Sequence, residues 1–312
     1  MPNEAKHIPV LLNECIENLN IKPDGIYVDG TLGLGGHSEQ ILKRLDTGRL
    51  IGIDRDESAI RRTGERLAQY ADKMTLVHGN FCDVSQILDE LGIDAVDGML
   101  FDLGVSSPQL DEAERGFSYM NDAPLDMRMD NTSVLTAYNV VNDWSEAELA
   151  RILRDFGEER YARRIASRIV ERRNAKPIET TLELVDVIRS AMPPAALREK
   201  QHPAKRTFQA IRIAVNDELN SVAKAMDAAI PCLNPGGRLA VITFHSLEDR
   251  IVKNAMAAAA KGCICPPEFP VCVCGKKPKL RLVSRKPIVS GEEELERNPR
   301  ARSAKLRVCE KR

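Results

Sequence analysis

The chain has 312 residues, of which 43% are hydrophobic, 29% charged and 4% aromatic, and its formal net charge is −1. No apolar run approaches the roughly 20 residues that cross a bilayer, and the first residues lack the apolar core of a signal peptide. We therefore expect neither a membrane span nor secretion, but a cytoplasmic globular protein of one large or two ordinary domains.

The charge is unevenly distributed along the chain. Residues 151–176 hold nine Lys/Arg against four acids, and residues 261–312 hold fourteen against six. Two basic segments on an acidic body favour a polyanionic partner such as a nucleic acid. The alternative is a solvated helix face in the first segment and a basic tail in the second.

Residues 26–54 carry the pattern of a βαβ nucleotide-binding unit. An apolar strand ends at Asp29, a loop with glycines at 30, 33, 35 and 36 leads into a helix, and a second apolar strand ends at Asp54. Glycines let a ligand approach the backbone, and a carboxylate at the second strand end can accept ribose hydroxyls. The loop fits a dinucleotide or S-adenosylmethionine, although Ser38 stands where a dinucleotide site usually has its third glycine. A tight turn without ligand is the third interpretation.

Strand and helix patterns alternate as far as residue 102. We expect strands at 27–29, 50–54, 75–78 and 96–102 and helices near 8–20, 37–45, 56–69 and 83–91. Such alternation predicts a mostly parallel sheet with helices on both faces.

The pattern then changes twice. Residues 103–132 read as a long polar loop, and helical patterns alone follow, at 133–141, 145–155, 158–174 and 181–191. The α/β pattern resumes with one amphipathic helix from Phe208 to Met226, then a strand at 238–244, a helix near 246–261 and a closing hairpin from 280–283 and 305–308.

These elements predict an α/β protein with about seven strands and an antiparallel end. A dinucleotide domain usually closes with a parallel sixth strand instead, so the pattern resembles the seven-stranded S-adenosylmethionine-dependent methyltransferase (Rossmann-like) fold. The expected domains are a discontinuous methyltransferase domain, residues 1–132 and 206–312, and an inserted all-helical substrate-recognition domain, residues 133–205.

Two further groups of residues follow expected strands. Phe81 follows the third strand, where a methyltransferase of this fold usually holds adenine, although it also fits a core aromatic. Ser107-Pro108-Gln109 follows the fourth strand and resembles the Ser/Asp/Asn-Pro-Pro-aromatic motif of methyltransferases that act on amino groups of bases, without its second proline and aromatic residue. An exocyclic amine is a weak nucleophile, so acceptors that align it would contribute much of the catalysis.

Six long motifs, in order, resemble those of the ribosomal RNA small subunit methyltransferase H (RsmH, or MraW) family. They are Asp29-Gly-Thr-Leu-Gly-Leu-Gly-Gly-His37-Ser, Phe101-Asp-Leu-Gly-Val-Ser-Ser-Pro-Gln109-Leu, Arg115-Gly-Phe-Ser, Pro124-Leu-Asp-Met-Arg-Met129, Thr207-Phe-Gln-Ala-Ile-Arg-Ile-Ala-Val-Asn-Asp-Glu218-Leu and Thr243-Phe-His-Ser-Leu-Glu-Asp-Arg250. The resemblance runs from His7 to nearly the end of the chain.

The resemblance implies methyl transfer from S-adenosylmethionine to the N4 amino group of a decoding-centre cytidine in 16S ribosomal RNA, with the small ribosomal subunit as partner. The cofactor-binding residues that it implies are Gly35, Gly36, His37, Asp54, Phe81, Asp102 and Gln109. Ser107 and Pro108 are our candidates for positioning the target amine. The basic helix 158–174, with Lys205-Arg206, would hold RNA phosphates.

Other residues carry weaker expectations. His245 could relay a proton, although a histidine at a strand end is more often structural. Phe117 and Tyr119 could stack on the target base or fill the gap beneath their own loop. The cysteines Cys263, Cys265, Cys272 and Cys274 could hold zinc, but C-x-C pairs depart from the usual spacing, and we assign no metal ligand.

Three rival functions stay open at this stage. A dinucleotide oxidoreductase would need a third glycine near Ser38 and a hydride-transfer site. An RNA-binding assembly factor without catalysis is disfavoured because Asp54 and Asp102 are both present. DNA in place of RNA as substrate is disfavoured only by the family resemblance.

Overall fold

The computed structural model describes residues 9–263, 265–266, 269–271 and 273–312. The chain forms two compact units, which we call the sheet unit, Met1–Gly104 with Leu219–Arg312, and the helical unit, Val105–Glu218. Within the described residues, no helix is both long and apolar enough to cross a membrane.

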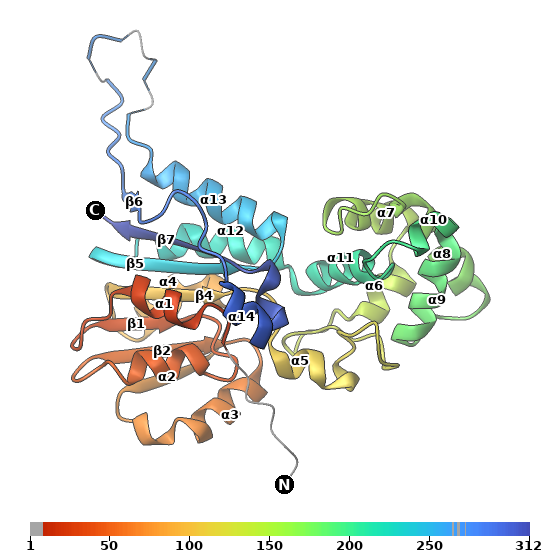
Figure 1. Ribbon diagram of the computed structural model, residues 1–312, viewed down its shortest axis with the longest axis horizontal. Helices are drawn as coiled ribbons and strands as arrows, with labels where there is room; N and C mark the ends of the chain where they lie inside the picture. Colours follow the sequence, from red (N-terminus) through yellow and green to blue (C-terminus); the bar gives the residue numbers. More distant parts are fainter. Residues whose placement is uncertain (1–8, 264, 267–268, 272) are drawn as a thin grey trace. The chain divides into compact units, whose positions relative to one another are not determined.

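The sheet unit contains one seven-stranded sheet in the order β3-β2-β1-β4-β5-β7-β6 (Figure 1). Pairings among β1 to β5 are parallel, whereas β7 pairs antiparallel with both β5 and β6. The strands are β1 Ile26–Asp29, β2 Arg49–Asp54, β3 Met74–His78, β4 Val96–Asp102, β5 Leu233–Thr243, β6 Leu280–Leu282 and β7 Lys305–Lys311. The predicted seven-stranded α/β architecture with an antiparallel end is confirmed.

Helices cover both faces of this sheet because side chains alternate along each strand. One face packs Val28, Ile51 and Met99 against α4, α12 and α13, and the other packs Tyr27, Leu50 and Leu100 against α1 and α2. The helices are α1 Leu12–Leu19, α2 Gly36–Leu42, α3 Glu57–Arg66, α4 Val84–Glu90, α12 Glu218–Ala229, α13 Ser246–Ala260 and α14 Glu292–Arg297.

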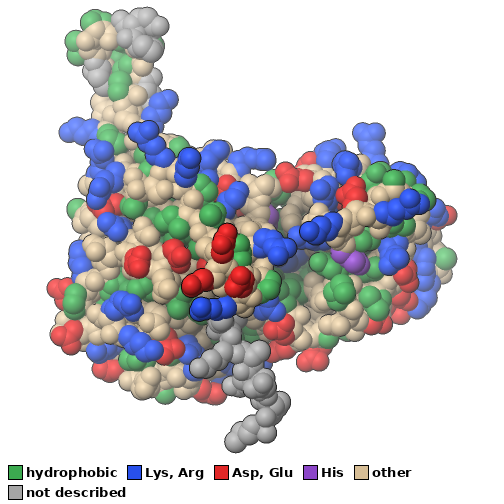
Figure 2. Space-filling view, viewed as in Figure 1, with side chains coloured by type: hydrophobic (Ala, Val, Ile, Leu, Met, Phe, Trp, Pro, Cys, Tyr) green, Lys and Arg blue, Asp and Glu red, His purple; other side chains and the backbone are tan. Residues whose placement is uncertain are grey.

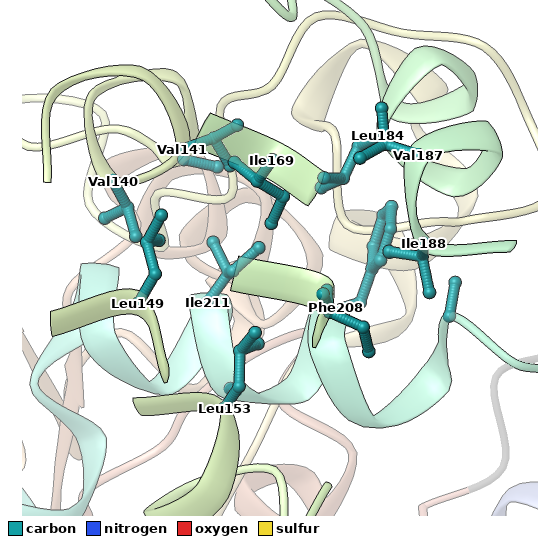
Figure 3. Close-up of a cluster of buried hydrophobic side chains, with 14 of the residues drawn as sticks. Val140, Val141, Leu149, Leu153, Ile169, Leu184, Val187, Ile188, Phe208 and Ile211 are labelled. Carbon is teal, nitrogen blue, oxygen red and sulfur yellow. The ribbon is translucent and has the colours of Figure 1, made fainter. Parts of the chain in front are cut away.

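The helical unit has its own core around α11 Lys205–Asn216. Figure 3 shows Phe208 and Ile211 of this helix among buried side chains of its neighbours. The other helices are α5 Ser107–Asp111, α6 Ala137–Asp143, α7 Glu146–Asp155, α8 Ala162–Ala175, α9 Thr181–Ala191 and α10 Pro194–Leu197. Ser and Thr caps with capping boxes begin α6, α7 and α9. The starts of α7 and α9 agree closely with the expected 145 and 181, whereas α6 begins at Ala137 and not at the expected 133.

The helical unit is larger than the expected insertion of residues 133–205. Phe117, Leu125 and Met129 of the expected loop are buried in its core, as are Phe208 and Ile211 of α11. The units therefore divide at Gly104 and Glu218, not at the expected boundaries. Burial of apolar side chains, not helical periodicity, determines where each unit ends.

The single helix expected from Phe208 to Met226 is wrong. The structure has two helices, α11 and α12, separated at Asp217, whose φ of 49° is left-handed. Phe208 packs in the helical unit and Met226 in the sheet unit. Apolar residues continue at three- and four-residue steps through the break, so the periodicity hides it. Strand β5 also begins earlier than expected, at Leu233, with an irregular register against β4.

Candidate functional site

Three carboxylates end neighbouring parallel strands of the sheet unit. Asp29 ends β1, Asp54 ends β2 and Asp102 ends β4, and β1 pairs with both other strands. The carboxyl ends of parallel strands share one edge of the sheet, where ligands bind in open α/β folds. This edge therefore holds the predicted residues of the first, second and fourth strands.

Asp29 fastens the glycine loop to the helix that follows it. Its carboxylate is 2% exposed and accepts hydrogen bonds from Ser38 Oγ at 2.6 Å and from the Thr31 backbone N–H at 3.2 Å. Burial, more than these bonds, sets the pKa of Asp29 and raises it to about 6. Ser38 stands where a dinucleotide loop has glycine, and its hydrogen bond to Asp29 holds the start of α2 against the end of β1.

Thr31 joins the loop to the neighbouring strand. Its Oγ1 accepts a hydrogen bond of 2.6 Å from the backbone N–H of Asp102, at the end of β4. A glycine at this position would leave that N–H without its acceptor. Thr31 therefore has a structural reason to be threonine, which only the tertiary contact with Asp102 reveals.

Asp54 also binds the loop. Its Oδ2 accepts from Gly33 N–H at 2.7 Å and its Oδ1 from Asp56 N–H at 2.8 Å. Burial raises the pKa of Asp54, and these two backbone bonds oppose that rise. Each carboxylate oxygen can accept more than one hydrogen bond, so the bonds leave capacity for ligand hydroxyls.

Side chains of the α3 region hold the carbonyl groups of the same loop. Thr63 Oγ1 donates to Gly33 O at 2.8 Å, while Arg66 donates to Leu34 O at 2.9 Å and to Gly35 O at 2.7 Å. Sequence reasoning missed both residues because neither belongs to a recognisable motif. The loop is thus held in place by the protein itself, through both its N–H and its C=O groups.

Gly35 and Gly36 are required by packing inside the protein. A Cβ on Gly35 would lie 2.5 Å from Thr63 Cγ2, and one on Gly36 would lie 2.2 Å from Pro9 Cγ. Gly35 also has a left-handed φ of 72°. We expected these glycines to admit a ligand, and the structure gives the close approach of Thr63 and Pro9 as an independent reason for them.

Asp102 is the most perturbed carboxyl group at this edge. Its Oδ1 is buried and has no hydrogen-bond partner among the residues that the structure describes, although 26% of the side chain is exposed. Burial first, and then the charges of Asp29 and Glu248, raise its pKa to about 8. A buried carboxyl oxygen without a partner is costly, and such groups concentrate at functional sites.

His37 lies beside Asp102 in the first turn of α2. Its Nδ1 is 3.9 Å from Asp102 Oδ2, and its Nε2 is 3.1 Å from the carbonyl oxygen of Val10. Because a carbonyl can only accept, Nε2 carries a hydrogen. The ring is therefore oriented by the backbone and directs Nδ1 towards the carboxyl group.

Phe81 follows β3, in the 3₁₀ turn Phe81–Asp83. Its ring is only partly buried and packs on Phe101, with centroids 5.4 Å apart. The neighbouring Asn80 receives the Cys82 N–H and donates to Ser221 Oγ at 3.4 Å. Phe81 thus joins the edge of the core, as the core-aromatic interpretation expected, while part of its surface stays accessible.

Ser107, Pro108 and Gln109 belong to the helical unit and begin α5, where the sequence predicts only a loop. Gln109 is 4% exposed, and its Oε1 accepts the Ser106 N–H at 3.0 Å in a capping box. Ser107 is buried as well, and the Pro108 carbonyl accepts the Glu112 N–H at 2.8 Å. Their polar atoms therefore already take part in local structure.

The remaining motifs of the helical unit bind one another. Arg115 is 9% exposed and donates to the carbonyls of Arg128 and Met129 at 2.9 and 3.2 Å. Arg128 forms an ion pair of 2.7 Å with Asp126, and Asn216 receives the Met129 N–H at 2.8 Å. These residues brace the segment that follows α5.

Phe117, Tyr119 and His245 each carried a functional and a structural interpretation, and their contacts favour the structural one. Phe117 is buried, and the partly buried Tyr119 stacks on His202 with ring centroids 4.6 Å apart, so both fill space beneath their loop. His245 is the N-cap of α13, and its Nδ1 accepts the Glu248 N–H at 3.4 Å. That capping role supports the structural interpretation of His245.

The basic residues of the helical unit divide into two kinds. Arg173 donates to the carbonyls of Val141 and Trp144, each at 2.6 Å, and is structural. Arg163 and Arg164 of α8 are exposed, and among the described residues neither forms a hydrogen bond or ion pair. Figure 2 shows Lys and Arg side chains gathered over the part of this unit that Figure 1 labels α7, α8 and α10.

Comparison with known proteins places the chain in a family. Three relatives bear the name Ribosomal RNA small subunit methyltransferase H. They come from Heliobacterium modesticaldum, at 57% identity over 98% of both chains, Clostridium botulinum strain Kyoto, at 59% over 99% of both, and Brevibacillus brevis, at 58% over 98% of both. The sequence model of the MraW methylase family matches residues 4–312. The family resemblance expected from the six motifs is thereby confirmed, and the chain belongs to the MraW methylase family.

Proposed function

We propose that this protein transfers a methyl group from S-adenosylmethionine to the N4 amino group of a decoding-centre cytidine in 16S ribosomal RNA. The observation that carries the proposal is the identity of 57–59% over nearly the whole chain with small-subunit ribosomal RNA methyltransferases. The cytosine, its N4 atom and its place in the decoding centre are what the family resemblance carried by the six motifs implies.

The strand-end carboxylates support the choice of cofactor. S-adenosylmethionine supplies a methyl group bound to a positively charged sulfur, and it also carries an ammonium group. In the part of the chain that the structure describes, Asp102 Oδ1 is buried without a hydrogen-bond partner, and burial raises the pKa of Asp102 to about 8. A cation beside Asp102 would stabilise its ionised form and lower that pKa, so the site favours a positively charged ligand.

The remaining cofactor residues are proposed in the roles that the motifs give them. Asp54 has spare acceptor capacity for ribose hydroxyls, and Phe81 has accessible ring surface for adenine. Gly35, Gly36 and His37 lie in the braced segment beside Asp29. Gln109 is the weakest member of the set, because its side-chain oxygen already caps α5.

Target positioning is proposed for Ser107 and Pro108. An amine on cytosine has its lone pair conjugated into the ring, so it needs acceptors for its hydrogens and a fixed direction of approach. Ser107 and Pro108 open α5, and that helix follows the Asp102 strand end after a short connection. The exposed Arg163 and Arg164 would hold phosphates, which position RNA without reading its sequence.

The reaction can be tested with small ribosomal subunits from a strain that lacks the enzyme. The protein is incubated with these subunits and methyl-labelled S-adenosylmethionine, the RNA is digested, and the nucleosides are separated and identified by mass spectrometry. We expect the label in N4-methylcytidine. Label in 5-methylcytidine alone, or none in RNA, would refute the proposed target.

Two parallel samples test other substrates. Duplex DNA in place of the subunits tests the DNA alternative. If label appeared in the DNA and not in the RNA, DNA would replace RNA as the proposed substrate. Protein-free 16S RNA tests whether the assembled subunit is required. As a control, the Asp46→Ala variant changes an exposed acid of the sheet unit. It should transfer label to the ribosomal subunits as the unchanged protein does.

A further inference from the structure

The described residues of the loop between α13 and β6 form no hydrophobic core of their own. Among its described residues from 263 to 275 none is buried, and Phe269, Val271 and Val273 are 49%, 70% and 74% exposed. Figure 1 shows the chain projecting from the end of α13 and returning to β6. Small segments that cannot bury apolar surface usually depend on a cross-link or a bound metal for their structure.

Three cysteine sulfurs gather in this loop. The Sγ atoms of Cys263, Cys265 and Cys274 all lie within 4.8 Å of one another, and those of Cys263 and Cys274 are 3.8 Å apart. A tetrahedral zinc site with Zn–S bonds of about 2.3 Å places its sulfurs about 3.8 Å apart. A disulfide needs about 2.05 Å. The spacing therefore fits sulfurs arranged around a common metal and not a disulfide.

Backbone N–H groups point at two of these sulfurs. Cys265 N–H donates to Cys263 Sγ and Val273 N–H donates to Cys265 Sγ, each at 3.4 Å. N–H donors stabilise negative charge on sulfur, and metal ligands are commonly held by such outer hydrogen bonds. Gly275 has a left-handed φ of 61° directly after Cys274, a conformation that glycine adopts easily.

The surrounding charge also suits bound thiolates. Lys261, Lys276, Lys277 and Lys279 are exposed at the base of the loop, where Figure 2 shows Lys and Arg side chains gathered. Their positive charges offset those of several thiolates on one divalent ion. The fourth cysteine of the sequence pattern, Cys272, lies outside the described residues.

We propose that Cys263, Cys265 and Cys274 bind one Zn²⁺, which orders the loop between α13 and β6. Thiolate donors in a compact cluster select zinc over the harder Mg²⁺ and Ca²⁺. The site is separate from the strand-end carboxylates, and its proposed role is structural. It does not depend on the methyl-transfer reaction, so either proposal can fail without the other.

The test measures metal directly on the full chain. The protein is stripped with a chelator under reducing conditions, given a small excess of Zn²⁺, passed through a desalting column and analysed for zinc by mass spectrometry. We expect about one equivalent of zinc per chain. A value below about a tenth of an equivalent would overturn the proposal, because structural thiolate sites bind zinc tightly.

Variants locate the site. Cys263→Ser and Cys274→Ser should each lose most of the zinc, and the matched control Cys232→Ser, at a partly buried cysteine outside the loop, should keep it. Co²⁺ in place of Zn²⁺ should give the intense visible bands of tetrahedral cobalt and a thiolate charge-transfer band. These bands should disappear in Cys263→Ser and persist in Cys232→Ser.

Three results would contradict the assignment. They are zinc retained when all three described cysteines are changed to serine, zinc lost equally from Cys232→Ser, and the weak spectrum of octahedral cobalt. Trypsin gives a readout independent of activity, because Lys276 and Lys277 are exposed. Zinc should slow cleavage at this loop severalfold in the unchanged protein, and equal cleavage with and without zinc would count against an ordering role.

Discussion

The motif acids of the two units differ in the direction in which their pKa values shift. At the strand ends of the sheet unit, the pKa values of Asp29 and Asp102 are raised, mainly by burial, and within the described part of the chain Asp102 Oδ1 has no hydrogen-bond partner. In the helical unit, burial also acts on Asp126, but hydrogen bonds from Arg128 overcome it and lower the pKa of that carboxyl group. Arg115 likewise donates to two carbonyl groups.

This difference shows that belonging to a family motif does not make a residue a ligand contact. Polar groups that already have partners contribute to stability, because removing one partner leaves the other buried and unsatisfied. Polar groups held without partners weaken stability and mark the place where a ligand would compensate them. Substitutions in the two units should therefore affect different measurements.

The largest effect is expected for Arg115→Ala. This change removes a nearly buried guanidinium that donates to the carbonyls of Arg128 and Met129 and lies 5.9 Å from the Phe117 ring. We expect the free energy of unfolding to fall by about 3 kcal/mol, measured by urea denaturation followed by circular dichroism. The control, Arg163→Ala on the exposed face of α8, should change it by less than about 0.5 kcal/mol. Unchanged stability with lost cofactor affinity would instead place Arg115 among the ligand contacts.

The next effect concerns Asp54→Ala and cofactor affinity. Loss of this carboxylate removes the acceptor for Gly33 N–H and the proposed acceptor for ribose hydroxyls. We expect the Kd for S-adenosylmethionine to rise by about 30- to 150-fold, or about 2–3 kcal/mol, measured by calorimetry. Asp46→Ala should bind as the unchanged protein does, and Asp54→Asn, which keeps an acceptor oxygen, should fall between them. An unchanged Kd in Asp54→Ala would remove Asp54 from the site.

The smallest effect is a change in pH dependence on Asp102→Asn. The folded protein keeps the Asp102 proton up to a pKa of about 8, whereas the unfolded chain releases it near pH 3.9. Between these values the native state binds more protons than the unfolded state, so this group makes stability fall as the pH rises. Asp102→Asn should remove this group's contribution to the fall in stability. We expect that contribution to be about 2 kcal/mol between pH 5 and pH 8, less than the pKa shift alone would give, because the side chain is 26% exposed and solvent screens its charge.

Urea unfolding at pH 5 and pH 8 without cofactor provides the measurement. Asp126→Asn is the matched control, because the pKa of Asp126 is shifted in the opposite direction to that of Asp102. The lowered pKa of Asp126 contributes stability that is lost only as the pH falls through that pKa. It should therefore weaken the protein at both pH values. The same pH slope in Asp102→Asn and in the unchanged protein would contradict the electrostatic difference between the units.

Sequence patterns predict most of the sheet unit well. Alternating apolar strands and polar strand ends placed Asp29, Asp54 and Asp102 at one edge, because parallel strands share the direction in which they end. Helical patterns similarly marked the helices of the insertion. Both signals are local, so one sequence is enough to recognise them.

Three features depended on contacts between distant residues. The helix break at Asp217 lies inside a continuous periodic pattern, and only packing against two different cores reveals it. Thr63 and Arg66 brace the glycine loop across about thirty residues of chain, with no motif to mark them. Phe117 is buried and Tyr119 partly buried by neighbours that their own segment does not predict.

The sequence by itself determined the family, the α/β class and the polar strand ends, because these depend on residue type and spacing along the chain. Tertiary structure alone decided which of those polar groups have partners. Among the described residues, it showed Gln109 and Arg115 already bound, Asp102 Oδ1 without a hydrogen-bond partner, and three cysteines close together despite their atypical spacing. Whether a polar group has a hydrogen-bond partner depends on positions in space, because the partner often comes from a residue far away in the sequence.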